Sequence, residues 1–541
     1  AAAVLFNATG FGLMVSAVMG AVPEGFWIRT GLPGILSFAG LVWAMLRLLS
    51  GRTPSVRLEA SLGCLASGPV AEAWMLQADT GDVSRLAVSV VLTAGPSCIS
   101  FCLLVRSTPT GKGKPLRVFR RSGTGLPAGV GQVELPHCAR GPIPFTFGRG
   151  QDQRRERMPR PILIKNAEVF APEKLGRRDI FIAGGRIVAM EESLEGLSVP
   201  GLETIDACGA IVTPGLIDQH IHVTGGGGEG GPATRTPELV LSELVACGTT
   251  DVVGVSGTDY TTRSIPNLLA KVRALQAEGV SAWMYTSNYR CPPTLLTDSI
   301  GNDLFFIPEV LGVKIALGDH RSSFPDVQTV LSMLADIRVG AMLAGKIGFL
   351  HIHNGNIPGA FAMYEEIVSR GFPVKHIRPT HCGRIRHVFD SAVQFALKGG
   401  WIDITTGASC CFDHPAQAVV EAIAAGVDPT HITLSTDGHG SVPRFNDKGE
   451  MVGLGVGGVD GNLKETIRLI RDHNMPIEQA LTFTTSNVAG ALGIKGHGVI
   501  ETGACANACL FTEDFELKGV FARGREMMRD GEILVKGTFE Y

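Results

Sequence analysis

The chain lacks an excess of charge of either sign. Its 541 residues include 48 Lys and Arg against 51 Asp and Glu, which gives a formal net charge of −3. A nucleic-acid surface would require a surplus of positive charge, and an acidic tail would require the opposite. We therefore expect no nucleic-acid partner.

The twelve cysteines lack the spacing of a zinc ribbon or of a disulfide framework. They are scattered along the chain, and none of them forms a Cys-x-x-Cys pair. Free thiols in a reducing compartment are the simpler interpretation, so we expect a cytoplasmic protein.

Charge is absent from three apolar stretches near the start of the chain, at 1–23, 30–46 and 86–105. Each approaches the about 20 residues that cross a bilayer. However, Gly and Pro interrupt them, the chain begins with Ala1 rather than Met, and Met158 opens a more regular pattern. We expect residues 1–157 to be non-native upstream sequence or poorly ordered. A membrane-associated segment is the alternative, and any membrane contact would lie only in these residues.

A chain of this length predicts two or three domains. Short strand patterns occur at both ends of the region that follows residue 157, with Gly184-Gly185 as a hairpin turn between two of them. The expected strands are 162–169, 179–183, 186–190, 517–522, 525–529 and 532–535. These ends predict one β-sandwich domain built from 158–212 and 497–541.

The middle of the chain, 213–496, alternates apolar runs with helical patterns such as 237–247 and 265–278. The apolar runs are 210–223, 250–255, 282–287, 313–317, 348–353, 374–380, 401–405 and 432–437. Eight strands alternating with helices is the composition of a (β/α)8 barrel, whereas an open doubly wound sheet has fewer strands. The predicted fold is therefore a (β/α)8 barrel with a flanking β-sandwich.

Catalytic groups of such barrels lie at the C-terminal ends of the strands. The polar residues that end or follow a predicted strand are His220, His222, His353, His381 and Asp437, and Lys314 lies within the fourth strand. His220 and His222 are two residues apart on a strand, so both imidazoles face the same way and can share a metal. A surface histidine pair is the alternative.

Lys314 lies inside an apolar strand, where burial disfavours the ammonium form. The neutral amine can react with carbon dioxide, and the two oxygens of the carbamate can bridge two cations. A lysine that extends to the strand end is the alternative. Asp437 can contact a metal and move a proton, or it can cap the next helix.

His353 is preferred over His351 as a ligand because it ends its strand, whereas His351 is expected deeper in the barrel. Asp218 is a candidate outer partner of the His pair. The other histidines are expected on loops or helix surfaces; they are His320, His376, His387, His414, His431, His439, His473 and His497.

Taken together, these residues resemble the amidohydrolase superfamily over about residues 160–541. Within it, the chain is similar to the isoaspartyl dipeptidase family. The matching segments are His-Ile-His-Val-Thr-Gly-Gly-Gly-Gly-Glu at 220–229, Gly-Val-Lys-Ile-Ala-Leu-Gly-Asp-His-Arg at 312–321, Pro-Thr-His-Cys-Gly-Arg at 379–384 and Ser-Thr-Asp-Gly-His-Gly-Ser at 435–441. One departure is Gly-Ala-Cys-Ala-Asn-Ala-Cys at 503–509, where relatives carry Asp-Ala-Asp; it falls in the expected sandwich.

The resemblance implies two zinc ions per subunit. His220, His222 and Asp437 would bind one, His353 and His381 the other, and carboxylated Lys314 would bridge them. A bridging hydroxide would attack the isopeptide bond of an isoaspartyl dipeptide, and Asp437 would pass the proton to the leaving amine. The resemblance also implies a homo-oligomer.

The substrate contacts implied by the resemblance involve charged and hydroxyl side chains. Glu229 would hold the α-amino group, and Tyr289 would polarise the scissile carbonyl. Arg321 and Arg384 would bind carboxylates, with further contacts from Thr258 and Ser441. An isoaspartyl dipeptide carries one ammonium and two carboxylates, so one acid and two arginines form a complementary set.

Several alternatives remain open. The glycines at 225–228 could cradle a phosphate, but no Lys-Ser/Thr follows them. A dihydroorotase or hydantoinase acting on a cyclic amide would share the metal ligands. Two further alternatives are a non-catalytic scaffold on the same fold and a membrane protein with an inactive enzymatic tail.

Overall fold

The computed structural model describes residues 160–445 and 451–540, together with the backbone of four earlier strands. The chain divides into two compact units, Ala1–Pro144 and Phe145–Tyr541. The four strands of the first unit form one antiparallel sheet: β1 (Ser55–Leu58), β2 (Ala73–Asp79), β3 (Leu86–Gly95) and β4 (Cys98–Ser107). The apolar stretch 86–105 thus coincides with the pair β3 and β4. The stretches 1–23 and 30–46 lie outside the described residues.

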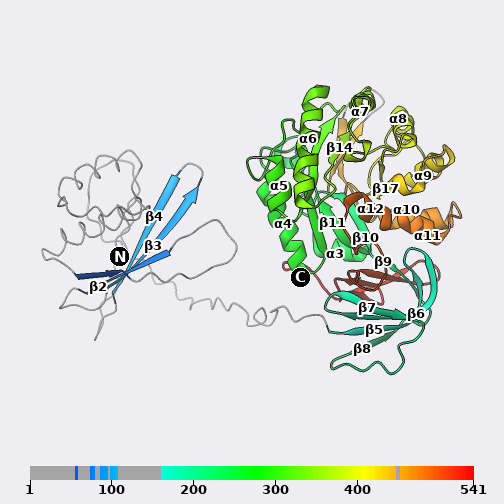
Figure 1. Cartoon of the computed structure of the whole chain (residues 1–541), viewed down its shortest axis with the longest axis horizontal. Helices are drawn as coiled ribbons and strands as arrows, with labels where there is room; N and C mark the ends of the chain where they lie inside the picture. Colours follow the sequence, from blue (N-terminus) through cyan, green and yellow to red (C-terminus); the bar gives the residue numbers. More distant parts are fainter. Residues whose placement is uncertain are drawn as a thin grey trace. The chain divides into compact units, whose positions relative to one another are not determined.

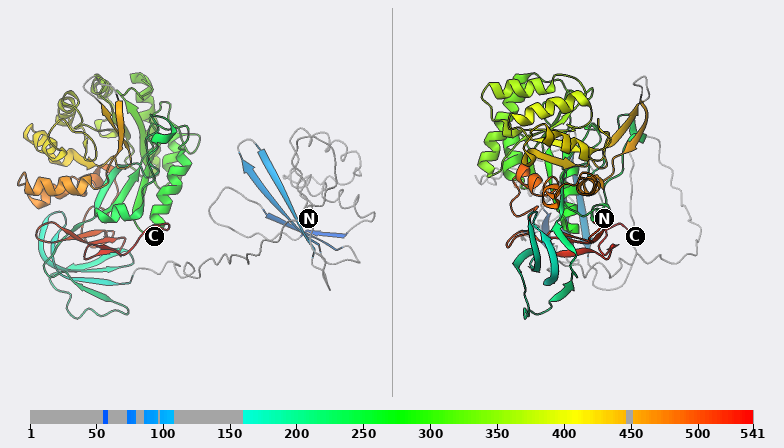
Figure 2. Two further views of the ribbon diagram at one scale, coloured as in Figure 1. Left: turned by 180° about the vertical axis from the view of Figure 1, so that it is seen from behind. Right: turned by 90° about the vertical axis from the view of Figure 1, so that its right-hand side faces the viewer.

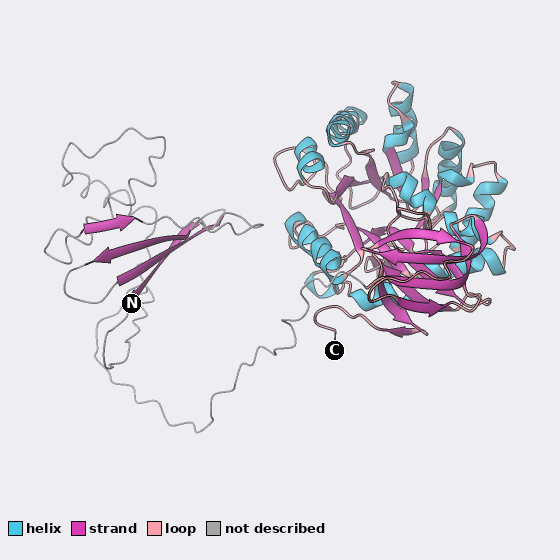
Figure 3. Ribbon diagram, turned by 60° about the horizontal axis from the view of Figure 1, so that its bottom comes forward, coloured by secondary structure: helices cyan, strands magenta, loops and turns pink. Residues whose placement is uncertain are grey.

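Both ends of the second unit contribute to one nine-stranded sheet, which lies at one end of the barrel (Figures 1 and 3). Its order is β23-β22-β21-β20-β9-β5-β6-β7, and β8 pairs with β5. The strands are β5 (Ile162–Phe170), β6 (Lys174–Ala183), β7 (Arg186–Glu191), β8 (Glu203–Asp206), β9 (Ile211–Pro214), β20 (Ala508–Phe511), β21 (Leu517–Ala522), β22 (Arg525–Arg529) and β23 (Glu532–Ile533). The flanking β-sandwich predicted from the two ends is confirmed.

The turn between β6 and β7 shows how the sequence sets this sheet. Gly184 and Gly185 have φ values of +59° and +79°. Two successive positive φ angles are the requirement of the two-residue hairpin turn that matches strand twist, and glycine adopts them without strain. Buried Ile164, Ile180 and Ile182 form part of the apolar core beneath the hairpin.

The barrel strands run parallel to one another. Strands β10 to β15 form a six-stranded sheet, and β16 pairs with β17. Their bounds are β10 (Leu216–Ile221), β11 (Thr249–Gly254), β12 (Ser281–Thr286), β13 (Val310–Leu317), β14 (Leu350–Asn354), β15 (Ile377–Thr380), β16 (Ile402–Thr405) and β17 (Ile432–Ser435).

Backbone hydrogen bonds close the barrel. The Cys382 N–H donates to the Asp403 carbonyl at 3.0 Å, which joins β15 to β16. The Asp437 N–H donates to the His220 carbonyl at 3.0 Å, and the His222 N–H donates to Gly438 at 2.9 Å. These last two bonds join the ends of β17 and β10. The predicted (β/α)8 barrel is therefore confirmed, and its seam passes through candidate ligands.

Two predicted strands differ from the structure. The run 210–223 is divided at Gly215 into β9, which belongs to the sandwich, and β10, which belongs to the barrel. A Cβ at Gly215 would lie 2.1 Å from Thr250 Oγ1, so glycine allows the close approach where the chain changes sheets. Strands β9 and β10 are both buried throughout, so the apolar pattern does not reveal the break. The run 374–380 begins as the 3-10 helix η2 (Val374–His376), and only 377–380 is strand.

Helices cover the outside of the barrel (Figure 1). They are α3 (Leu241–Ala246), α4 (Ile265–Glu278), α5 (Ile300–Phe306), α6 (Val327–Ala344), α7 (Ala360–Ser369), α8 (Arg386–Leu397), α9 (Pro415–Ala424), α10 (Gly461–Arg471), α11 (Ile477–Thr482) and α12 (Ser486–Leu492), with 3-10 turns η1 (Pro232–Thr234) and η3 (Pro429–His431). Helix α3 is shorter than the predicted 237–247 because residues 237–240 are not helical.

Helix α6 shows local signals at both ends. The Asp326 side chain caps its start by accepting from Thr329 N at 2.8 Å, and Gly345 ends it with a φ of +67°. Among the described helices, α6 alone has the length and apolar composition of a membrane span. Its Val330, Leu334 and Ile337 are part of the barrel core.

A hairpin follows the last barrel strand and projects from the barrel in orange (Figure 2, right). It consists of β18 (Ser441–Phe445) and β19 (Met451–Val456), paired antiparallel. Because it begins at Ser441, four residues after Asp437, the hairpin starts at the edge of the candidate site.

Candidate metal centre

The first group of candidate ligands comes from the ends of β10 and β17 and from the interior of β13. Lys314 Nζ lies 2.9 Å from His220 Nε2. Asp437 Oδ1 lies 3.3 Å from His220 Nε2 and 3.2 Å from His222 Nε2. All four side chains are buried. Residues separated by more than 200 positions in the chain therefore present their polar atoms to one another.

The two remaining imidazoles lie beside this group. The ring centroids of His353 and His381 are 4.4 Å apart, and those of His220 and His381 are 5.1 Å apart. His381 Nε2 lies 3.9 Å from Asp437 Oδ2. The structure thus gathers all six predicted ligands at one mouth of the barrel.

The backbone is strained at two of these positions. His381 has a φ of +62° and Asp437 a φ of +56°, in the left-handed region that non-glycine residues seldom adopt. Such conformations cost free energy and concentrate at functional sites. His381 directly follows β15, and Asp437 lies two residues after the end of β17, so both unusual φ angles fall where the chain leaves a barrel strand.

The donor set fits a divalent transition metal. Ligand atoms of His220, His381 and Asp437 all lie within 4.8 Å of one another. His381 Nε2 is buried and has no hydrogen-bond partner in the described part of the chain. Burial lowers the pKa of His220 and His381 well below the usual value and that of His353 to about 3. The imidazoles are therefore neutral, which is the form that binds metal.

Lys314 has the chemistry expected of a bridging residue. Its side chain is fully buried, and burial lowers its pKa to about 7. Near neutral pH a large fraction of the amine is therefore unprotonated and nucleophilic. Its Nζ also lies 5.4 Å from the centroid of the Tyr289 ring. These residues could hold a pair of cations through a carbamate on Lys314.

Neighbouring groups orient the histidines. His351 lies deeper in the barrel, where its Nε2 is 2.8 Å from His220 Nδ1. Thr405 Oγ1 lies 2.6 Å from His381 Nδ1. In both cases the second ring nitrogen is held, so Nε2 faces the candidate ligands. Asp218 instead accepts from the backbone N–H groups of His220 and Thr436, so it fixes the strand rather than an imidazole.

Three glycines make room for the His222 ring. A Cβ at Gly257 would lie 2.9 Å from His222 Cε1, and one at Gly440 would lie 3.1 Å from Cδ2. A Cβ at Gly226 would lie 3.2 Å from Nδ1. A contact below about 3 Å forces a shift, so the position of the imidazole requires glycine at 257, whereas a Cβ at 226 or 440 would make a tight contact with the ring.

A pocket opens beside these residues. It is lined by His222, His353 and Asp437 together with the predicted substrate residues Thr258, Tyr289, Arg321, Arg384 and Ser441. Arg384 Nη2 donates to Asp437 Oδ2 at 2.8 Å. The substrate residues proposed from the sequence therefore line one cavity that the metal candidates also reach.

Glu229 lies at the edge of this pocket, held by two partners. Its Oε1 accepts from Arg321 Nη1 at 2.9 Å and from the Ser441 hydroxyl. Its Oε2 is buried and has no hydrogen-bond partner among the described residues. The carboxylate thus keeps one oxygen able to accept from a cationic group.

Tyr289 connects the pocket to the histidines. Its hydroxyl donates to His353 Nδ1 at 2.7 Å, and its ring centroid lies 5.2 Å from Arg321 Cζ. Burial raises the pKa of Tyr289 above the usual value. The phenol therefore remains a hydrogen-bond donor at neutral pH.

The sequence prediction missed Asp319 and misplaced one histidine. Asp319 is 6% exposed and accepts from His353 Nε2 at 3.0 Å. His376, predicted on a loop or a helix surface, is buried in η2 at 4% exposure, and His439 lies on a loop as predicted but is buried there at 5% exposure. His376 bonds to the Gly348 carbonyl, and His439 Nε2 lies 3.0 Å from Glu243 Oε2.

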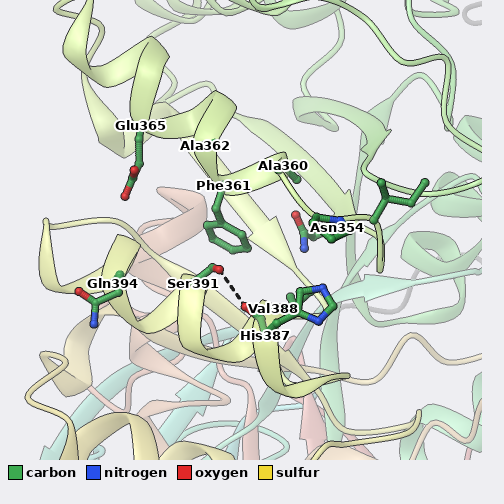
Figure 4. A pocket seen from close by; sticks show the side chains of 12 residues that line it. Asn354, Ala360, Phe361, Ala362, Glu365, His387, Val388, Ser391 and Gln394 are labelled. Atoms are coloured by element: carbon green, nitrogen blue, oxygen red, sulfur yellow. Dashed lines mark hydrogen bonds between the residues drawn. The ribbon is translucent and has the colours of Figure 1, made fainter.

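A second cavity lies between α7 and α8 (Figure 4). Phe361 of α7 and Ser391 of α8 face it, and the Ser391 hydroxyl donates to the His387 carbonyl at 2.8 Å. Asn354 also lines it, but the adjacent His353 faces the other pocket because successive strand residues point to opposite sides. No candidate metal group of the described residues borders this cavity.

Comparison with known proteins decides the family. A model of the amidohydrolase family matches residues 349–527. The beta-aspartyl dipeptidase of Fervidobacterium islandicum AW-1, solved in complex with beta-Asp-Leu dipeptide, is 39% identical with a TM-score of 0.64; the match covers 69% of this chain and 98% of that one. The chain belongs to the amidohydrolase superfamily.

Curated relatives of this amidohydrolase are more distant. An adenine deaminase of Ruegeria pomeroyi is 26% identical over 402 residues, which is 70% of this chain and 59% of the relative. A dihydroorotase of Staphylococcus aureus is 25% identical over 294 residues, which is 52% of this chain and 65% of the relative. The amidohydrolase therefore spans about three fifths of the length of these relatives.

Proposed function

We propose that this amidohydrolase cleaves the β-aspartyl bond of isoaspartyl dipeptides at a pair of zinc ions. The similarity to a solved structure that contains beta-Asp-Leu supports this substrate class. The argument from this chain's own residues rests on the charges that line the pocket.

The buried Oε2 of Glu229 carries the proposal. The other oxygen of this carboxylate accepts from Arg321, yet Oε2 has no partner among the described residues. A buried carboxylate oxygen left unpaired is unfavourable unless a ligand supplies a donor. An α-ammonium group is such a donor, and the isoaspartyl dipeptide carries one.

Arg321 and Arg384 supply positive charge for the two carboxylates of the substrate. Their side chains are 13% and 18% exposed, so the water that would screen them is largely excluded. Planar guanidinium groups bind carboxylates through paired hydrogen bonds. Because Arg384 contacts Asp437 directly, we infer that a carboxylate held there lies close to the reacting bond.

His220, His222, His353, His381, Asp437 and carboxylated Lys314 would hold the zinc pair. When bound, the ions would lower the pKa of water so that it can attack near neutral pH, and would polarise the scissile carbonyl. The Tyr289 hydroxyl would donate a hydrogen bond to the carbonyl oxygen as negative charge develops there.

Asp437 is suited to move the proton. Burial alone would raise the pKa of its carboxyl, but His381, His220 and His222 hold it well below the usual range. Asp437 is therefore ionised and can accept a proton from the attacking water. It would then return that proton to the leaving α-amine.

A substrate panel tests the proposal. The full chain, supplied with zinc and bicarbonate, is incubated with β-Asp-Leu, α-Asp-Leu, dihydroorotate and adenine. We expect release of leucine from β-Asp-Leu at a kcat/KM at least about 100-fold above that for α-Asp-Leu, because the backbone amide of the α isomer lies one methylene closer to the ammonium. Turnover of dihydroorotate or adenine without turnover of β-Asp-Leu would refute the assignment.

The distant relatives favour hydrolysis or deamination of a ring compound as the second candidate. Neither dihydroorotate nor neutral adenine carries an ammonium group, so those substrates would leave Glu229 Oε2 without a cationic partner. A non-catalytic scaffold is the third candidate. Elemental analysis showing well under one zinc per chain after reconstitution would favour the scaffold.

A further inference from the structure

Asp319 lies two residues after the end of β13 and contacts both parts of the site. Its Oδ2 accepts from His353 Nε2 at 3.0 Å and from Arg321 Nη2 at 3.0 Å. Its Oδ1 accepts from Arg321 Nε and from the Arg321 backbone N–H, both at 2.8 Å. One buried carboxylate thus joins a candidate metal ligand to a candidate substrate-binding arginine.

The contact with His353 fixes which ring nitrogen is free. Two groups contact His353 Nε2: the Asp319 carboxylate, which only accepts, at 3.0 Å, and Arg321 Nη2, which only donates, at 3.3 Å. The shorter contact with the carboxylate favours the tautomer with the ring proton on Nε2. The lone pair is then on Nδ1, the atom that lies 2.7 Å from the Tyr289 hydroxyl on the pocket side. Asp319 therefore presents Nδ1, and not Nε2, as the atom of His353 available to a metal.

The contact with Arg321 fixes the plane of the guanidinium group. Asp319 occupies Nε and Nη2, which leaves Nη1 directed at Glu229 at 2.9 Å. A two-point grip of this kind sets orientation as well as charge. The donor of Arg321 that faces the pocket is therefore placed by Asp319.

The loop after β14 depends on the same residue. A Cβ at Gly355 would lie 2.5 Å from both the Cα and the Cβ of Asp319, so only glycine lets this loop close against it. The Gly355 N–H donates to the Leu317 carbonyl at 2.9 Å, which joins the end of β14 to the end of β13. His353, two residues before Gly355, is held close to Asp319 by this packing.

We propose that Asp319 is a positioning residue that couples metal affinity to substrate affinity through His353 and Arg321. The metal half of this inference stands on the geometry alone, and the substrate half rests on the proposed function. A structural carboxylate would stabilise the loop but would alter neither zinc binding nor the Michaelis constant.

The substitution Asp319→Asn removes the charge and keeps the shape. On the full chain, we expect the zinc dissociation constant to rise by about 10- to 100-fold, as for other outer partners of ligating histidines. A chromophoric chelator that competes for zinc measures this without substrate. The KM for β-Asp-Leu is expected to rise as well. The control is Asp336→Asn, on the exposed face of α6, which should leave both constants unchanged.

Arg321→Lys separates the two contacts. The lysine keeps the positive charge but loses the planar guanidinium group that makes two hydrogen bonds at once. We therefore expect the KM to rise and the zinc affinity to change by less than about twofold. If Asp319 acts on substrate through Arg321, the rises in KM caused by Asp319→Asn and Arg321→Lys will not add in the double variant. Additive effects would overturn the substrate half of the proposal.

Unchanged zinc affinity in Asp319→Asn would overturn the metal half. Circular dichroism of the metal-free variant checks its folding; if that variant is unfolded, Asp319→Glu is used, since a longer carboxylate displaces both contacts and should also weaken zinc binding. A wild-type protein that binds zinc but does not cleave β-Asp-Leu would refute the proposed function and leave the zinc test of Asp319 intact.

Discussion

Replacing Glu229 by Gln isolates the proposed contact with the substrate ammonium. The amide retains a carbonyl oxygen that can accept from Ser441, but it loses the charge that pairs with Arg321 and with a ligand cation. A hydrogen bond to a charged group contributes about 1.5–3 kcal/mol. Since 1.4 kcal/mol is about tenfold, kcat/KM for β-Asp-Leu should fall about 10- to 150-fold.

The assay compares two substrates. Leucine release is measured from β-Asp-Leu and from succinyl-Leu, which has the same scissile amide and both carboxylates but no ammonium group. The wild type should prefer β-Asp-Leu, and the Glu229→Gln variant should lose most of that preference. An equal loss on both substrates would refute the reasoning, because it would place the role of Glu229 in holding Arg321.

Three further predictions follow from the packing and the pKa shifts. Gly257→Ala should displace the His222 ring, because the new Cβ would lie 2.9 Å from His222 Cε1. Zinc content and activity should therefore fall at least about tenfold. The control is Gly490→Ala, whose new Cβ would have no atom within 4 Å and should change neither quantity. Burial lowers the pKa of Lys314 to about 7, so a 13C-carbamate NMR signal from labelled bicarbonate should be strong at pH 8 and weak at pH 6; equal signals would contradict the free-amine argument. Burial raises the pKa of Asp403 to about 6 from 3.8. Between these two pH values the folded state holds a proton that the unfolded state has lost. The stability that this proton contributes is fully present below pH 4 and is lost as the pH rises through 6. In urea unfolding of the metal-free protein, the free energy of unfolding of the wild type should therefore fall by about 3 kcal/mol as the pH rises, and the Asp403→Asn variant should lack this fall. Parallel curves of unfolding free energy against pH for the two proteins would contradict this prediction.

The barrel could be predicted because its strands are buried on both faces and its helices are not. Apolar runs such as 250–255 and 432–437 nearly coincide with β11 and β17. The break at Gly215 could not be found in this way, because β9 and β10 belong to different sheets yet share one continuous buried pattern. Only the clash that a side chain would make with Thr250 reveals why glycine stands there.

The candidate ligands could be named because strand ends meet at one mouth of a barrel, so position in a strand substitutes for position in space. The residues that orient these ligands could not be predicted from the sequence. Asp319 reaches His353 and His351 reaches His220 across 34 and 131 residues, respectively, and no spacing in the sequence encodes those contacts. The contact of His439 with Glu243 could not be predicted for the same reason, since the two residues lie 196 positions apart.

Zinc stoichiometry tests the central claim most directly, namely that His220, His222, Lys314, His353, His381 and Asp437 hold a metal pair. The full chain is reconstituted with zinc and bicarbonate, desalted, and analysed for metal per chain beside Lys314→Ala. We predict about two zinc ions per wild-type chain and at most one in the variant, because the carbamate would bridge both ions. Two zinc ions retained in Lys314→Ala, or fewer than one in the wild type, would contradict the account.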